Sequence, residues 1–169
     1  MGGARPLHPA RWLGVPALMC VAATIVFAAP IRFYGLQLPE PVFAMVPAFA
    51  WALIRPSILA PFALLVLGLF LDMFWGGPSG LWALSLLVAY ATALTGRNMM
   101  AGQSRPMMWA WFAGVTAVAM AGGFLFSMLD SLAMPSLLAV FWQFLVTALL
   151  FPFAHRLIDR FEDADVRFR

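Results

Sequence analysis

Long uncharged segments dominate this chain of 169 residues and limit what it can fold into. Six such segments lie between the charged side chains, and four of them contain 20 or more residues. The other two, between Glu40 and Arg55 and between Arg55 and Asp72, contain 14 and 16 residues. A bilayer core about 30 Å thick requires roughly 20 apolar residues of helix. The spacing therefore predicts six transmembrane helices, near residues 12–30, 38–54, 57–75, 80–96, 107–129 and 132–154; prolines are expected to shorten or kink the second.

The composition excludes several other classes of protein. Only 10% of the residues are charged and 64% are hydrophobic, with a mean hydropathy of +0.93. A soluble domain carries about 25% charged residues, and disorder requires low hydrophobicity with high net charge. A net charge of +3 provides no dense basic patch for nucleic acid. The single cysteine, Cys20, forms no intramolecular disulfide and indicates no zinc site. We expect one membrane domain over residues 1–169, all-α, with six helices joined by short loops.

The arginines predict the orientation of this bundle. With six spans and a cytoplasmic N-terminus, nine arginines face the cytoplasm and only Arg32 faces outward. This asymmetry is what the positive-inside rule requires. Both termini are then cytoplasmic, and residues 155–169 form a tail of mixed charge that continues the sixth helix. The alternative for the first span is a cleaved signal peptide, but its 20 uncharged residues exceed the 7–15 of a signal h-region. The nine inner residues are Arg5, Arg11, Arg55, Arg97, Arg105, Arg156, Arg160, Arg167 and Arg169.

No ionisable residue is predicted at mid-bilayer depth. Glu40, Asp72 and Asp130 fall at the ends of spans, where they reach water and headgroups. The sequence therefore shows no proton relay.

Ser79 lies in a GxSG pattern typical of rhomboid proteases, but the topology places His155 on the opposite side of the membrane. A Ser–His pair requires hydrogen-bond contact, so we expect no enzyme, and no cofactor or metal.

The stretch from Asp72 to Gly80 is the most informative turn. Asp72 is placed to cap the N–H groups at the start of the fourth helix, and the glycines permit a tight backbone path. An ordinary structured turn and a partner-docking surface are both compatible with this pattern.

Small residues at four-residue spacing in the second and fifth spans favour close helix packing, either within the bundle or at a dimer face; they are Ala44, Ala48 and Ala52, and Ala113, Ala117 and Ala121.

An ordered set of short motifs resembles the MreD family of bacterial rod shape-determining membrane proteins. The set starts with Pro39 and Glu40 and continues with WALIRP at residues 51–56. Gly68, Leu69 and Asp72 follow, then GGPSGL at residues 76–81 with Ala-Leu at 83–84. The specific part covers residues 39–84, about a quarter of the chain, and Gln143, Thr147 and Pro152 in the last span are compatible but generic. Glu40 departs from the aspartate expected after the proline and keeps its charge.

The resemblance implies a non-enzymatic scaffold of the cell-elongation machinery in the bacterial inner membrane. Its implied partners are an MreC-like single-span protein, MreB filaments, and the RodA synthase with its penicillin-binding partner, all met in or beside the lipid bilayer. The residues it implies for structure and docking are Asp72, Gly76, Gly77, Pro78, Gly80, Arg55, Pro56 and Glu40.

The alternative function is the substrate-binding subunit of an energy-coupling-factor vitamin transporter, which is also a small six-helix protein. Such a subunit needs a pocket with several convergent polar groups. The polar residues in or near the spans are sparse, and interhelical hydrogen bonds are the simpler explanation for them: Ser57, Ser85, Tyr90, Thr92, Thr116, Ser127, Gln143 and Thr147.

Overall fold

The computed structural model describes residues 10–28, 32–33, 36–37, 40–131 and 136–166. Apart from one two-residue strand pair, the regular elements of these residues are helical, as the sequence predicts. The elements are a π-helical turn Ala10–Gly14, α1 (Val15–Phe27), β1 (Arg32–Phe33), β2 (Leu36–Gln37), α2 (Met45–Ile54), α3 (Leu59–Trp75), α4 (Leu81–Met100), α5 (Arg105–Ser131), α6 (Leu137–Ala148) and α7 (Phe151–Val166). The antiparallel pairing of β1 with β2 was not expected.

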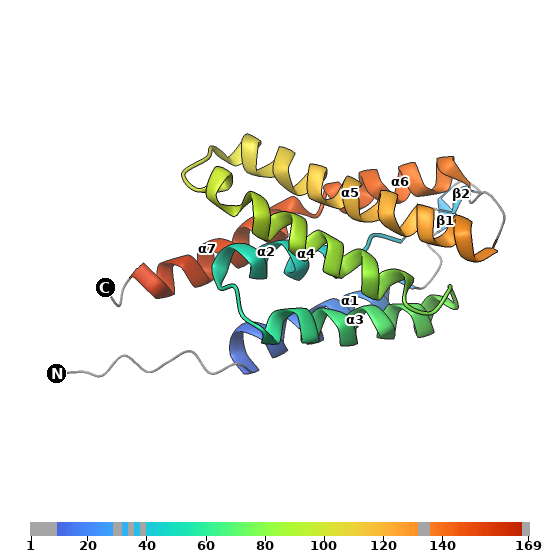
Figure 1. The fold of residues 1–169 in the computed structure, drawn as a ribbon, viewed down its shortest axis with the longest axis horizontal. Helices are drawn as coiled ribbons and strands as arrows, with labels where there is room; N and C mark the ends of the chain where they lie inside the picture. The colour runs from blue at the N-terminus through green and yellow to red at the C-terminus, as the bar shows by residue number, and fades with distance from the viewer. Residues whose placement is uncertain (1–9, 29–31, 34–35, 38–39, 132–135, 167–169) are drawn as a thin grey trace.

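The helices run up and down along one long axis (Figure 1). Helices α1, α3 and α5 run toward the end that carries the strand pair, whereas α2, α4, α6 and α7 run back. The π-helical turn and the end of α7 consequently lie at the same end of the bundle. Helix α2 packs against both α4 and α7, and its residues 45–52 are all buried, so this short helix forms part of the core.

Helix α2 begins later than the sequence predicts. The expected span covered residues 38–54, but residues 40–42 are irregular and the helix starts only at Met45. Pro47 has no N–H to donate to the carbonyl of Phe43, four residues earlier. That carbonyl instead accepts hydrogen bonds from the Val46 amide at 3.1 Å and the Cys20 thiol at 3.4 Å. The prolines therefore shorten this helix, as expected. The prediction of helix is wrong for residues 40–44, and residues 38–39 lie outside the described residues.

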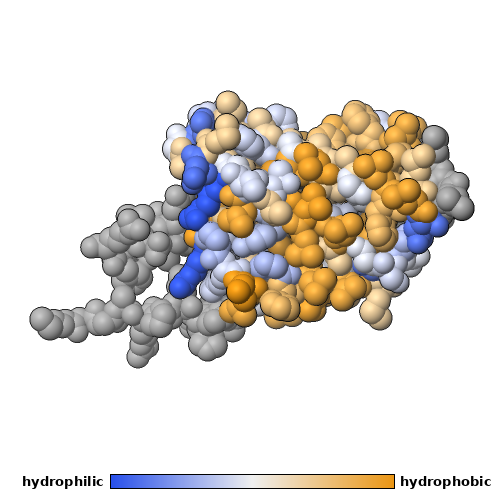
Figure 2. All heavy atoms as spheres, in the orientation of Figure 1, coloured by the Kyte–Doolittle hydropathy of each residue, from blue (hydrophilic) through white to orange (hydrophobic). Residues whose placement is uncertain are grey.

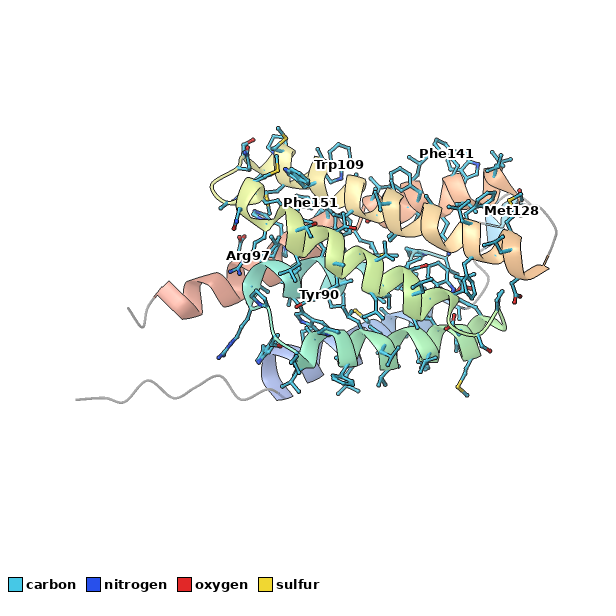
Figure 3. The ribbon with its side chains drawn as sticks, in the orientation of Figure 1. Tyr90, Arg97, Trp109, Met128, Phe141 and Phe151 are labelled. Carbon is cyan, nitrogen blue, oxygen red and sulfur yellow. The ribbon has the colours of Figure 1, made fainter. Side chains whose placement is uncertain are left out.

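The last predicted span, residues 132–154, is not one continuous helix over its described part, which begins at residue 136. Residues 149–150 separate α6 from α7, and α7 continues to Val166, so the expected tail is helical as far as that residue. Pro152 cannot donate to the Ala148 carbonyl. The Trp109 indole nitrogen on α5 donates to that carbonyl at 3.0 Å. Figure 3 shows Trp109 and Phe151 on the elements that meet at this break.

Aromatic and small side chains fill the core between these helices. The rings of Phe49 on α2 and Phe112 on α5 meet edge to face, with their centroids 5.3 Å apart. The three alanines of the stripe near α2, at positions 44, 48 and 52, are buried, as internal packing requires. On α5, by contrast, Ala117 and Ala121 are exposed, so the expectation of internal packing is wrong for that stripe.

Large apolar side chains also cover much of the outside. Figure 2 shows hydrophobic residues over the middle of one face and hydrophilic residues gathered toward the end that carries the α4–α5 turn. Two stretches are long and apolar enough to cross a membrane, Arg105–Asp130 and Leu137–Asp159. Three further apolar helices are shorter, at Trp12–Phe27, Met45–Ile54 and Leu59–Trp75.

Candidate functional site

Asp72 joins the end of α3 to the start of α4. Its side chain is buried, and its two carboxylate oxygens accept hydrogen bonds from the amides of Gly80 and Trp82, each at 2.8 Å. The first amides of a helix have no partner within the helix, and a negative charge is favourable there. The expectation that Asp72 caps the fourth helix is therefore confirmed.

Two glycines give the turn its shape. Gly76 ends α3 with a φ of 64°, and Gly80 precedes α4 with a φ of 95°. Both lie in the left-handed region, which side chains with a Cβ rarely adopt. Gly77 and Ser79 between them are exposed, and Pro78 is half-buried. The turn is thus fixed from inside by Asp72 and presents small residues on its surface.

Glu40 lies against this turn although it is far away in the sequence. Its carboxylate accepts a 2.7 Å hydrogen bond from the indole nitrogen of Trp75, the last residue of α3. The Trp75 ring in turn packs edge to face on Trp82, with a centroid separation of 5.0 Å. Glu40, Asp72 and the two tryptophans therefore form one connected unit, and we call this end of the bundle the turn end.

Gln143 and Thr147 on α6 hold the irregular segment that follows Glu40. The Gln143 amide donates to the Glu40 carbonyl at 3.3 Å, and the Thr147 hydroxyl accepts from the Val42 amide at 3.1 Å. The same hydroxyl donates to the Gln143 carbonyl at 2.7 Å. A backbone amide or carbonyl buried away from water needs a hydrogen-bond partner. These two side chains provide such partners for Glu40 and Val42.

The structure does not bring all the predicted site residues together. Arg55 and Pro56 are exposed after the end of α2, at the opposite end of the bundle from Asp72. Asp130 is exposed near the end of α5. Ser79 lies in the α3–α4 turn, whereas His155 lies on α7, where its ring stacks on Phe151. Ser79 and His155 are therefore separated along the bundle and form no catalytic pair.

Four of the eight polar residues considered for a vitamin pocket bond to backbone: Ser85, Thr92, Gln143 and Thr147. Ser85 donates to the Leu81 carbonyl and Thr92 to that of Val88, each at 2.8 Å within α4. Ser57 and Thr116 have buried hydroxyl oxygens with no hydrogen-bond partner. Within the described ranges, no group of three or more His, Cys, Asp or Glu side chains is placed to hold a metal ion.

Sequence reasoning missed the roles of Trp75, Trp82 and Thr147. Trp75 stands at the end of a predicted span, and this position alone does not indicate a bond to Glu40. The partner of Thr147 is 105 residues away, at Val42, so no local pattern indicates this contact.

Comparison with known proteins identified no relative of this chain. The chain matches no model of a known protein family, no curated protein and no solved structure. The geometry of the turn end is therefore the basis for a functional proposal. Asp72 is bound to two amides and Glu40 to an indole, so these two acids hold the turn from inside, with the exposed Met73, Gly77 and Ser79 around them.

Proposed function

We propose that this chain is a non-enzymatic membrane scaffold of the bacterial cell-elongation machinery, similar to the MreD family. The observation that carries the proposal is the gathering of Glu40, Asp72 and residues 76–80 at one end of the bundle. These residues belong to the ordered set on which the resemblance rests. The motif with Glu40 and the motif from Asp72 to Gly80 thus contribute to one connected unit. This supports a shared role of the two motifs in docking a partner.

The scaffold crosses the inner membrane six times with both termini in the cytoplasm. Helices α3 and α4, with 17 and 20 residues, are about 25 and 30 Å long at 1.5 Å per residue. Those lengths are close to the thickness of a bilayer core. Helix α2 is only about 15 Å long, and the irregular residues 40–42 extend its crossing. The positions of Arg55, Arg97, Arg105 and Arg156 at one end support the cytoplasmic assignment.

The turn end faces the periplasm and docks a partner. Asp72 and Glu40 hold the surface from inside, while Met73, Gly77 and Ser79 are exposed around them. A single-span MreC-like protein is the proposed direct partner. MreB filaments and the RodA synthase with its penicillin-binding partner complete the assembly. The scaffold acts by holding these proteins together, and no reaction step is assigned to it.

Affinity purification from the native host in mild detergent, followed by mass spectrometry, tests the proposal. We expect a single-span coiled-coil protein and cell-wall synthases to be recovered. Gly77→Asp places a charge on the exposed turn, where an added Cβ meets no atom within 4 Å, so the fold should persist while the partner is lost. Ser104→Asp, in the exposed α4–α5 loop at the other end, is the matched control and should retain the partner.

Two outcomes contradict this proposal. Recovery of ATPases with a second multi-span subunit would instead favour the transporter alternative. Equal recovery of the coiled-coil protein by both variants would remove the turn end as the docking surface.

A further inference from the structure

Four arginines surround the end of the bundle opposite the turn end. Arg55 follows α2, Arg97 lies in the last turn of α4, Arg105 begins α5 and Arg156 lies on α7. Because α2 packs against α4 and α7, and α4 packs against α5, these positions lie around one another. Arg97 is half-buried and the other three are exposed. Figure 3 labels Arg97 on α4, and we call this part of the molecule the arginine end.

The guanidinium groups of the arginine end are not neutralised by acids of the described residues. The carboxylate that the structure describes at this end is that of Asp159, and its oxygen lies 3.4 Å from the His155 imidazole. None of the four arginines forms an ion pair within the described part of the chain. Their charges are therefore available to an anionic partner.

Each of these arginines has an exposed apolar neighbour three or four residues away. On a helix, this spacing puts both side chains on one face. Three of the pairs lie on helices, and the directions of α4, α5 and α7 put the apolar residue nearer the middle of the bundle and the arginine nearer its end. Arg55 and Ile58 lie in the connection between α2 and α3. The pairs, with the exposed fraction of the apolar residue, are Arg55 with Ile58 (80%), Arg97 with Leu94 (37%), Arg105 with Trp109 (46%) and Arg156 with Phe153 (58%).

This repeated order matches the layers of a membrane surface. One turn of helix separates the members of a helical pair by about 5 Å along the axis. An apolar side chain in the acyl region thus positions its arginine among the phosphates. The guanidinium fork also suits phosphate, which it binds through two hydrogen bonds. An acidic soluble protein would bind the charges but would have no use for the apolar residues beside them.

We propose that the arginine end binds the phosphate groups of anionic phospholipids in the leaflet that surrounds it. This inference rests on the membrane insertion of the proposed function and does not depend on the docking partner. The turn end differs in charge, since the described residues there include three acids, Glu40, Asp72 and Asp130, beside one arginine, Arg32. Anionic headgroups should therefore be enriched at one end of the molecule only.

Native mass spectrometry of the full-length chain tests this proposal. The purified protein is incubated in detergent with equal amounts of phosphatidylglycerol and phosphatidylcholine, and the retained lipids are counted. We expect preferential retention of phosphatidylglycerol, which inorganic phosphate at the same concentration does not displace. Each single Arg→Gln change should weaken this retention about fivefold, the factor equivalent to about 1 kcal/mol per arginine.

The matched control changes a charge at the other end. Asp130→Asn alters an exposed side chain near the end of α5 and should leave the lipid preference unchanged. The quadruple variant Arg55→Gln, Arg97→Gln, Arg105→Gln and Arg156→Gln should retain both lipids equally. Circular dichroism and gel filtration check its fold, and the four single variants provide the result if it does not fold.

Two results would overturn the proposal. One is equal retention of the two lipids by the unaltered chain. The other is retention of an acidic polypeptide through the same arginines with no preference for phosphatidylglycerol, which would assign this end to a protein partner. Retention of lipid and retention of an acidic polypeptide are measured separately from partner recovery at the turn end. Failure of lipid binding at the arginine end therefore leaves the docking proposal unaffected, and the reverse also holds.

Discussion

Gly68 on α3 and Ala83 on α4 bring the backbones of two neighbouring helices into direct contact. A Cβ atom placed on Gly68 would lie 2.3 Å from the Cα and 2.5 Å from the amide nitrogen of Ala83. Only hydrogen fits in that space. Asp72 lies one helical turn after Gly68, so this close crossing puts its carboxylate beside the first amides of α4.

Gly68→Ala should destabilise the protein because neither backbone can move away without opening the crossing. Overpacking of this kind costs about 1–3 kcal/mol, and the melting temperature in detergent measures it. Gly114→Ala is the control, since Gly114 lies on an exposed part of α5 with no atom within 4 Å of the added Cβ. That change should stabilise the helix by about 0.5–1 kcal/mol. Equal melting temperatures for the two variants would contradict the close contact.

Asp72→Ala should also lower stability, because two amides at the start of α4 lose their acceptor. Loss of a helix cap costs about 0.5–2 kcal/mol, and bonds to a charged group lie at the upper end. Asp72→Asn retains one side-chain oxygen and should lose less. Denaturation of both variants in detergent gives the comparison, with the exposed Asp130→Ala as control. If Asp72→Ala were as stable as that control, the cap would not contribute.

The capping role of Asp72 could be predicted because it depends on local chain geometry. An acid, a glycine-rich turn and a new apolar helix follow one another within residues 72–84, so the turn brings the acid back to the helix start. The pairing of Glu40 with Trp75 could not be predicted in this way. It joins residues 35 positions apart and depends on how the irregular segment packs against α3.

A double-mutant cycle measures the Glu40–Trp75 contact. Glu40→Ala and Trp75→Phe each remove one side of the 2.7 Å hydrogen bond, and the double variant removes both. A bond to a charged group contributes about 1.5–3 kcal/mol, so the two single changes should not add. We expect a coupling free energy of about 1 kcal/mol or more from unfolding in detergent. Strictly additive losses would show that the contact does not stabilise the fold.

The positions at which helices begin and end also depend partly on neighbouring residues in the sequence and partly on contacts with other helices. Charged residues mark helix boundaries well in two places: Arg55 directly follows α2, and Arg105 is the first residue of α5. The prolines of the second span predict the disturbance at Pro47, whereas the break beside Pro152 lies inside a span predicted as continuous. In both places the outcome depends on which group bonds to the freed carbonyl. Cys20 and Trp109 take those carbonyls, and both come from other helices. The sequence therefore indicates that a helix is interrupted without showing where it resumes.

Thr147→Val tests whether α6 stabilises the irregular segment. The two side chains have nearly the same shape, but valine leaves the buried Val42 amide without its 3.1 Å acceptor. An unsatisfied buried donor costs about 1–3 kcal/mol, and we expect a loss of stability in that range. Thr92→Val is the matched control, because the Thr92 hydroxyl bonds only to the Val88 carbonyl of its own helix. Hydrogen exchange of the Val42 amide provides a local readout: it should become faster in Thr147→Val and stay unchanged in Thr92→Val. Unchanged exchange in both variants would show that packing alone holds residues 40–42 in place.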